Sequence, residues 1–495
     1  MIESHLPAII ALTFVLFSLL IPLIGIWTKK TAHPLAVLGT GLATAFSLMS
    51  FITYMNTGSI RYFFGGWEPP VGIEFVYDGL SGFILLVINS VAFLALIYAR
   101  RPGHMEFKGK ETAYYALAML MMLGFNGMVL TGDLFNLYVF LEISSLSSYA
   151  LISIGRKPAP FAAFRYLIIG TTGGTLYLLG VGFLYTNTGT LNIIDMSAML
   201  PMLVDNSSVV TALILMIVGI GVKAAIFPMH GWLPDSYTYA STPSSLLIAP
   251  IGTKVAAYVL FRVMLYLFGD DLTDAVVPIS YIVGVFACIG IIYGSVMAIA
   301  QTEMKRMLAY SSVSQIGYII MGLSLANPFG FAGALLHVLN HAVMKACLFM
   351  ITGNLRYKEG HSNISLFNDS YRKKYPWTMA SFSVAAISMV GLPPLAGFFS
   401  KWYLALGTID NSNWLFLAVI IVSSLLNAVY FFRILEKVYM KNPDADAQAE
   451  PAKEIEYDDV PASMMSPMAV LAIGLFVIGF ANAAIVTILL DIFPM

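Results

Sequence analysis

Seven ionisable side chains lie in stretches of the sequence that are otherwise apolar. They are Glu142, Lys223, Lys254, His337, His341, Lys345 and Lys401. A charged side chain at the centre of a bilayer costs about 2.5 to 3.5 kcal/mol, so such groups are rare and usually mark an ion or proton path. Histidine is the one side chain whose unperturbed pKa, about 6.5, lies near working pH. These residue types therefore favour a proton relay.

Three of the seven share one predicted helix, FAGALLHVLNHAVMKACLFM, at intervals of four. At about 100° per residue, His337, His341 and Lys345 form one stripe along roughly 12 Å of helix, and water between them could carry protons. Two other interpretations exist for the histidines. They could make interhelical hydrogen bonds, or they could share zinc, but HVLNH lacks the glutamate of HExxH. We therefore expect neither a metal site nor a cofactor.

Two lysines lie beside predicted helix breaks. Lys223 is followed by Pro228 and Pro234, and Lys401 follows the segment 391–394, GLPP. Proline removes a backbone donor and clashes with the preceding turn. Helices broken at membrane depth expose polar backbone that must line a cavity, and they are typical of ion-coupled transporters.

The remaining groups have distinct surroundings. Pro250 and Gly252 are predicted to disturb the helix just before Lys254, whereas Arg262, eight residues on, is interpreted as a snorkelling or structural charge. Glu142 precedes a row of serines that could hold water or accept a helix contact, Ser144, Ser145, Ser147 and Ser148. A carboxylate satisfied only by a neighbouring helix is the alternative for Glu142.

The elements that must position these groups are membrane-spanning helices. Of 495 residues, 59% are hydrophobic and 11% charged, with a mean hydropathy of +0.82, which excludes a soluble globular protein. We predict an all-α polytopic membrane protein. Fourteen apolar runs have the length of a span, near 6–27, 33–54, 79–99, 112–131, 134–154, 164–186, 208–229, 244–268, 277–300, 307–326, 330–354, 377–405, 414–440 and 465–489.

The distribution of basic residues supports this count and orients the chain. Twenty of the 26 Lys and Arg residues, Lys305 among them, fall in loops after odd-numbered spans, so these loops are predicted to be cytoplasmic. Both termini are then outside, and the acidic linker KNPDADAQAEPAKEIEYDD faces the cytoplasm. The net charge of -1 gives no reason to expect a nucleic-acid partner, and Cys288 and Cys347 lie in apolar runs that offer no metal centre.

The two broken helices are five spans apart, as helices 7 and 12. An odd repeat length forces two such units to insert in opposite orientations, which is an inverted-repeat architecture. We therefore divide the chain into helices 1–3 (1–111), inverted repeat 1 (112–268), inverted repeat 2 (277–440), an acidic cytoplasmic linker (441–463) and helix 14 (464–495).

Several of these segments together resemble a known family. TGDLFNLYVFLEISSLSSYALI, GVKAAIFPMHGWLPDSYTYASTPSSLLIAPIGTKVAAYVLFRV, KRMLAYSSVSQIGYIIMG, HVLNHAVMKACLFMITGN and GLPPLAGFFSKWYL are similar to the antiporter-like subunits shared by Mrp cation/proton antiporters and respiratory complex I. The similarity covers about residues 75 to 440. Within this family, the length and TGDLFNLYVFLEI are most like the D-type component of the Mrp complex.

The resemblance implies roles for the seven groups. Glu142 and Lys223 would form a central ion pair, Lys254, His337 and His341 would continue the path, and Lys401 would be its terminal group; Lys345 fits the same stripe. It also implies a bacterial cell membrane location and sodium/proton exchange within a complex with Mrp subunits A, B, C, E, F and G. As a subunit of a secondary transporter, the chain would not be an enzyme.

Two alternatives to the sodium-driven antiporter stay open at this stage. The first is a proton-pumping, non-redox subunit of complex I or of a membrane-bound hydrogenase, with the same relay. The second is a self-sufficient carrier of a small solute that uses the inverted repeat. A sugar or drug carrier would need a shaped polar pocket, and no cluster of Asn, Gln and Trp stands out.

Overall fold

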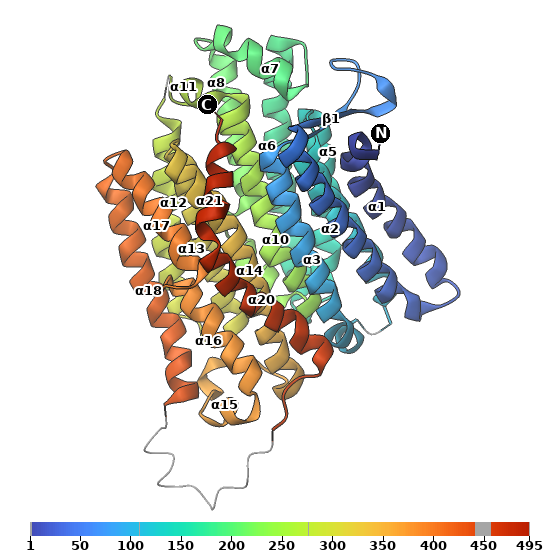
Figure 1. Ribbon diagram of the computed structural model, residues 1–495, viewed down its shortest axis with the longest axis vertical. Coiled ribbons are helices and arrows are strands. Elements are labelled where there is room, and N and C mark those ends of the chain that lie inside the picture. The colour runs from blue at the N-terminus through green and yellow to red at the C-terminus, as the bar shows by residue number, and fades with distance from the viewer. Residues whose placement is uncertain (1, 108, 276, 441–456, 495) are drawn as a thin grey trace, which may run out of the picture.

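Long helices that run side by side make up almost the whole protein. The structure, a computed structural model, describes residues 2–107, 109–275, 277–440 and 457–494. Figure 1 shows that α1 begins at the same end of the bundle at which α21 finishes. This arrangement agrees with an even number of spans.

The spans follow one another along the chain with short connections. They are α1 (Ile2–Gly25), α2 (Ala32–Thr57), α3 (Gly79–Glu106), α4 (Glu111–Leu130), α5 (Leu134–Ser153), α6 (Ala159–Thr188), α8 (Ser207–Ala224) with α9 (Leu233–Tyr239), α10 (Thr242–Phe261), α12 (Ile279–Ile299), α13 (Met304–Ser324), α14 (Pro328–Glu359), α16 (Pro376–Val390) with α17 (Ala396–Asp410), α18 (Trp414–Tyr439), and α20 (Ala462–Phe480) with α21 (Asn482–Asp491).

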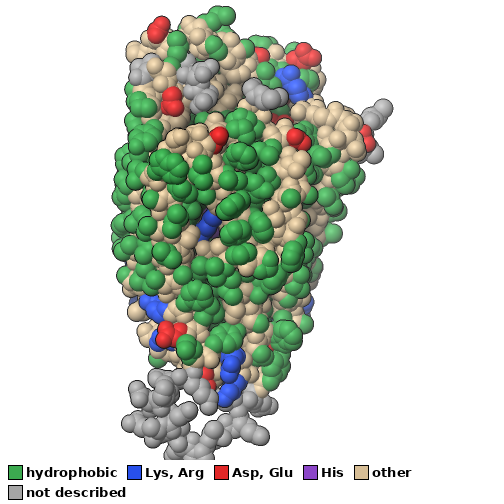
Figure 2. Space-filling view, turned by 60° about the vertical axis from the view of Figure 1, so that its left-hand side comes forward, with side chains coloured by type: hydrophobic (Ala, Val, Ile, Leu, Met, Phe, Trp, Pro, Cys, Tyr) green, Lys and Arg blue, Asp and Glu red, His purple; other side chains and the backbone are tan. Residues whose placement is uncertain are grey.

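The predicted helical membrane fold is confirmed. Within the described residues, twelve helices are long and apolar enough to cross a membrane by themselves. The less apolar α13 and the broken pair α16–α17 complete the predicted fourteen spans. The surface agrees, because a largely hydrophobic belt separates two ends at which charged side chains gather (Figure 2).

Smaller elements cover the ends of the bundle, and the sequence did not reveal them. They are the short helices α7 (Ile193–Met199), α11 (Gly269–Asp274) and α15 (Ser370–Lys374), and the antiparallel hairpin of β1 (Ile60–Phe63) and β2 (Glu74–Tyr77). The Glu74 carboxylate accepts from Arg61 Nε at 2.7 Å within the hairpin, and it ties the hairpin to the bundle by accepting from Asn192 Nδ2 at 2.6 Å.

Both predicted helix breaks are confirmed, and they share one local design. α8 ends at Ala225, whose φ of 57° is left-handed, and Pro228 follows three residues later. α16 ends at Gly391, with a φ of 91°, and Pro394 follows at the same interval. Left-handed residues terminate helices, and proline does not resume them.

The predicted disturbance before Lys254 is wrong. α10 runs without a break from Thr242 to Phe261, through Pro250, and changes to a π-helix only at Arg262–Leu267. Helices packed on all sides tolerate proline because their neighbours restrict the chain and can satisfy the freed backbone groups. α10 is buried along nearly its whole length, which supplies this restraint.

The two breaks belong to two units that are related in their connections as well. An isolated β-bridge joins Asp133, the N-cap of α5, to Asn192, and another joins Glu303, the N-cap of α13, to Asn363. Each bridge links the second helix of its five-helix unit to the loop after the third. α5 begins after four spans and α13 after nine, so the two bridges lie at opposite ends, as an inverted repeat requires.

Burial is greatest at the centre of the bundle. α10 and α14 pack against each other and are enclosed along most of their length, whereas the outer faces of α1, α2, α6 and α18 are exposed and apolar. Lys254 and the predicted stripe of α14 therefore lie in the interior and not at the lipid surface.

Candidate functional site

Glu142 and Lys223 are brought together by α5 and α8, as predicted. Lys223 Nζ lies 3.8 Å from Glu142 Oε1, which is an ion-pair distance but not a hydrogen bond. The ammonium donates instead to Ser145 Oγ at 2.7 Å and to Tyr149 OH at 3.2 Å. Glu142 Oε1 is buried and has no hydrogen-bond partner in the described protein. The pair is thus close but loosely coupled.

Glycines of α6 make room for this pair. A Cβ at Gly174 would collide with Glu142 Oε1, and a Cβ at Gly170 would collide with the hydroxyl of Tyr149 and lie 3.3 Å from Lys223 Nζ. Side chains at these two positions would displace both members of the pair. The small residues of α6 therefore set the positions of Glu142 and Lys223.

A small polar cavity extends from Lys223 toward α10. Its volume is about 20 Å³, which is enough for a single water molecule. Its polar lining includes Lys223, Ser144, Ser145, Ser148, Tyr237 and Thr253. The serines that follow Glu142 in the sequence thus hold the lysine and line this cavity.

Lys254 lies at the far side of the cavity wall. It is fully buried, and its Nζ donates to Ala249 O of its own helix at 2.8 Å and lies 3.4 Å from Thr253 Oγ1. No carboxylate of the described residues forms an ion pair with it. Thr253 therefore connects the first cavity to the second lysine.

The stripe predicted on α14 is fully buried in the middle of the protein. The rings of His337 and His341 stack with centroids 5.9 Å apart. His341 lies on α14, which packs against α10, the helix that carries Lys254, and neither of its ring nitrogens has a hydrogen-bond partner in the described protein. Lys345 Nζ donates to Leu308 O of α13 at 2.7 Å and to the hydroxyl of Ser311.

His337 connects the stripe to the second broken helix. Its Nδ1 lies 2.9 Å from Ser400 Oγ, and its Nε2 lies 3.0 Å from Gln315 Oε1. Ser400 directly precedes Lys401 on α17. The interhelical hydrogen bonds considered as an alternative are therefore present at His337 and absent at His341, within the part of the chain that the structure describes.

Lys401 fills the break between α16 and α17. Its Nζ donates to the carbonyls of Met389 and Val390 at 3.1 and 2.9 Å, and to Ser424 Oγ of α18 at 3.2 Å. A cation at the end of a helix satisfies free carbonyls and complements the helix dipole. The seven predicted groups thus form one row through α5, α8, α10, α14 and α17.

Several buried polar atoms along this row have no hydrogen-bond partner in the described protein. They include Glu142 Oε1, Tyr237 OH, both ring nitrogens of His341, Gln315 Nε2 and Asn340 Oδ1. Buried polar atoms of native proteins are usually paired, either with protein groups or with ordered water. Their position along the row suits water-mediated proton transfer.

Sequence reasoning missed several neutral partners of the row, among them Tyr149, Ser311, Gln315 and Ser400. Only the helical interval of seven residues between Glu142 and Tyr149 could have revealed one of them. The others contact the row across helices. No group of three His, Cys, Asp or Glu side chains that could hold a metal was found among the described residues.

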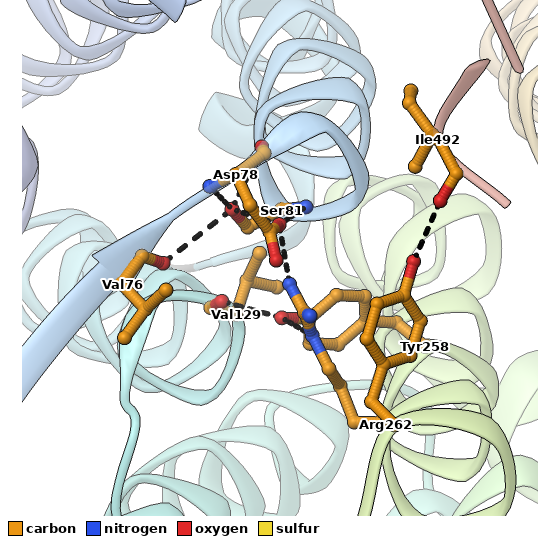
Figure 3. Close-up of polar contacts among 8 residues, drawn as sticks. Val76, Asp78, Ser81, Val129, Tyr258, Arg262 and Ile492 are labelled. Atoms are coloured by element: carbon orange, nitrogen blue, oxygen red, sulfur yellow. Dashed lines mark hydrogen bonds and ion pairs between the residues drawn. The ribbon is translucent and has the colours of Figure 1, made fainter. Parts of the chain in front are cut away.

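Arg262 lies outside the row and has a structural partner. Its Nη2 is 2.5 Å from Asp78 Oδ1, the N-cap of α3, and its Nε donates to Tyr258 OH at 2.7 Å (Figure 3). Tyr266, whose ring lies 4.6 Å from the guanidinium, donates to Ile492 O at 3.0 Å. Arg262 therefore does not snorkel to the surface but joins α3, α10 and the C-terminal end of α21.

Lys305 differs from its predicted place among the cytoplasmic loop residues. α13 begins at Met304, and Lys305 is buried, donating to the Ala240 carbonyl at 2.6 Å. Ala240 is the C-cap of α9, so this lysine closes the end of the first broken helix. Loop position in the sequence did not indicate that the side chain turns inward.

Fold and site together define a class of membrane protein. Two inverted five-helix units, each with a broken helix, and a buried row of ionisable groups characterise antiporter-like subunits. The chain belongs to the family described as NADH:quinone oxidoreductase/Mrp antiporter, TM, whose model matches residues 131–427.

Individual relatives point to two kinds of assembly. The NADH-quinone oxidoreductase subunit N of Desulforudis audaxviator is 44% identical over 95% of this chain and 96% of the relative. A Staphylococcus aureus protein that carries the name antiporter subunit mnhD2 is 32% identical over 91% and 88%. A chain of the Mrp complex from Dietzia sp. DQ12-45-1b has a similar structure, with a TM-score of 0.88 and 23% sequence identity. The match covers 99% of this chain and 97% of the Dietzia chain, and it supports the fold.

Proposed function

We propose that this chain translocates protons through the membrane midplane, along the row Glu142, Lys223, Lys254, His341, His337 and Lys401, with Lys345 beside it. The observation that carries the proposal is the continuity of this row from one broken helix to the other. Neutral hydroxyl and amide partners fill the intervals, and unpaired polar atoms offer sites for water.

The Glu142 and Lys223 pair supplies the switch. Opposite charges stabilise each other's ionised forms, so separating them favours release of the lysine proton. Lys223 Nζ already has two alternative acceptors, Ser145 and Tyr149, at hydrogen-bond distance. A rotation of the Glu142 side chain away from Lys223 would therefore leave the ammonium with neutral oxygens alone, beside the cavity that leads to Thr253.

We propose sodium/proton exchange as the process that drives this switch, with the chain acting as the D-type component of an Mrp-type antiporter. The mnhD2 relative, similar over nearly the whole chain, supports this assembly. The partners would then be subunits A, B, C, E, F and G. Sodium would bind outside this row, since its only carboxylate is Glu142.

A redox-driven complex is the second candidate, and the higher identity of the subunit N relative favours it. In that assembly the chain would be a proton-pumping subunit without redox chemistry of its own. The row of ionisable groups would keep the same roles. The two candidates differ only in what separates Glu142 from Lys223.

One experiment tests the proton relay and separates the two assemblies. The chain is purified together with its associated proteins and reconstituted into vesicles, and proton movement is recorded by a pH-sensitive dye. A sodium gradient should drive it in an Mrp-type complex, whereas an electron donor with quinone should drive it in a redox complex. If no proton movement is recorded under either condition in an intact assembly, the proposal is contradicted.

We also propose the orientation and the domain division predicted from the sequence. The end that carries Lys29, Arg100 and Arg356 would face the cytoplasm, with both termini outside in a bacterial cell membrane. The units would be 112–268 and 277–440, which the paired β-bridges support. Residues 441–456 of the acidic linker lie outside the described residues.

A further inference from the structure

A large basic cavity lies far from the relay, at the end of the bundle where α1 and α3 finish. It has a volume of about 860 Å³. Its lining comes from the turn between α1 and α2, the last turns of α3, the start of α4 and the start of α20. The relay groups are absent from this lining.

The charge of the cavity is strongly one-sided. Four permanent cations line it, Lys29, Lys30, Arg100 and Arg101, and none of them forms an ion pair with a carboxylate of the described residues. Glu111 is the single acid in the lining, and it already lies 3.8 Å from His104 Nδ1. Among the described residues, the cavity lining therefore has more cations than anions.

Exposed apolar side chains lie next to the lining residues in the chain and fit a lipid surface. Ile26 and Trp27, next to the cationic turn, are 77% and 75% exposed, and Met105 is 59% exposed. Tryptophan is enriched where spans leave the hydrocarbon for the headgroups. An occupant should therefore combine a negatively charged head with apolar chains.

We propose that this cavity binds the headgroup of an anionic phospholipid, with its phosphate among Lys29, Lys30, Arg100 and Arg101 and its acyl chains along the exposed faces of α1 and α2. Guanidinium groups bind phosphate oxygens through paired donors, and lysine ammonium groups add charge. Basic pockets between spans at the cytoplasmic side are suited to such headgroups. A bound lipid would link the outer pair α1 and α2 to α3 and α4.

The test uses the full chain purified with its associated proteins in detergent. The protein is exposed to equal amounts of phosphatidylglycerol and phosphatidylcholine, and retained lipid is measured by mass spectrometry. The double variant Arg100→Gln with Arg101→Gln should lower the retained ratio of phosphatidylglycerol to phosphatidylcholine at least threefold. The control, Arg372→Gln with Lys373→Gln, removes two charges from α15, outside the cavity, and should keep the parent ratio.

Further measurements separate the lipid from other anions and keep the result clear if the first variant fails to fold. Lys29→Gln with Lys30→Gln changes only the exposed turn and should give the same loss. Phosphatidylglycerol should raise the midpoint of thermal unfolding of the parent, while inorganic phosphate at equal concentration should not. Equal ratios in all variants, equal stabilisation by phosphate, or occupation of the cavity by an acidic partner protein would each overturn the proposal.

Discussion

Lys223 Nζ lies 3.8 Å from Glu142 Oε1, although it donates to Ser145 Oγ at 2.7 Å. The ammonium is thus held by a neutral hydroxyl while the carboxylate remains near enough to act on its charge. A buried pair with ideal geometry would be hard to separate, because each member would leave the other uncompensated. The loose arrangement suits a switch that must open and close.

Glu142→Gln should reduce proton translocation at least tenfold while the complex still assembles. The amide keeps the shape of the side chain but removes the charge that stabilises protonated Lys223. The measurement is the initial rate of proton movement in vesicles that contain the whole complex. Glu68→Gln, which removes an exposed carboxylate near the hairpin, should keep the parent rate. A parent rate in Glu142→Gln would exclude the pair as the switch.

Gly174→Ala should impair translocation although it removes no ionisable group. Its Cβ would collide with Glu142 Oε1 and push the carboxylate away from its place beside Lys223. Gly182→Ala is the matched control on the same helix, because its Cβ would meet nothing within 4 Å. Equal rates for the two variants would show that the position of Glu142 does not matter.

His341→Ala should reduce translocation at least tenfold, more than the loss of a structural histidine. His341 has no hydrogen-bond partner in the described protein, so its removal breaks no hydrogen bond, although it leaves a cavity in the buried core, and it interrupts the row between Lys254 and His337. His361→Ala, which changes a histidine in the loop after α14 and removes the contact of its Nδ1 with the Asn363 amide, should translocate at the parent rate. Equal rates with unchanged thermal stability would remove His341 from the path.

The sequence was sufficient to predict the spans, both broken helices and the members of the row. Charges inside apolar runs and prolines beside them are local features of the sequence. Each has a large free-energy cost within a membrane, so each indicates a functional or structural role. The loose geometry of Glu142 and Lys223 could not be predicted in this way. It depends on Ser145, Tyr149 and the glycines of α6, whose effect arises only when helices pack.

Other features of the structure could not be predicted from the sequence for a similar reason. Gln315 and Ser400 contact His337 from α13 and α17, and neutral side chains of these types carry no signal in a single sequence. Pro250 was predicted to disturb α10, but burial on all sides overrides the local preference. Lys305 was predicted to be a loop residue because its inward direction depends on the end of α9.

The partly buried pair of Asp78 and Arg262 should contribute to stability and not to proton transfer. Burial alone would raise the pKa of the Asp78 carboxyl, but the Arg262 guanidinium holds that pKa below its usual value. Asp78→Asn leaves the partly buried guanidinium without its carboxylate and should destabilise the protein by about 1 to 3 kcal/mol, less than the loss that is typical of a fully buried pair. Asp369→Asn, which breaks an exposed pair with Lys373, should cost about 0 to 1 kcal/mol.

The pH dependence of this contribution has a definite sign. A carboxyl whose pKa is lowered by folding stabilises the folded state above its unfolded pKa, about 3.9, and loses that stabilisation as the pH falls toward the lower, folded value. When the pH is lowered from 6 to 3, the midpoint of thermal unfolding should therefore decrease more in the parent than in Asp78→Asn. The double variant Asp78→Asn with Arg262→Gln should be more stable than Asp78→Asn, because no partly buried charge is left without its partner. If the double variant is the less stable of the two, Arg262 has a second partner whose contribution exceeds that of Asp78.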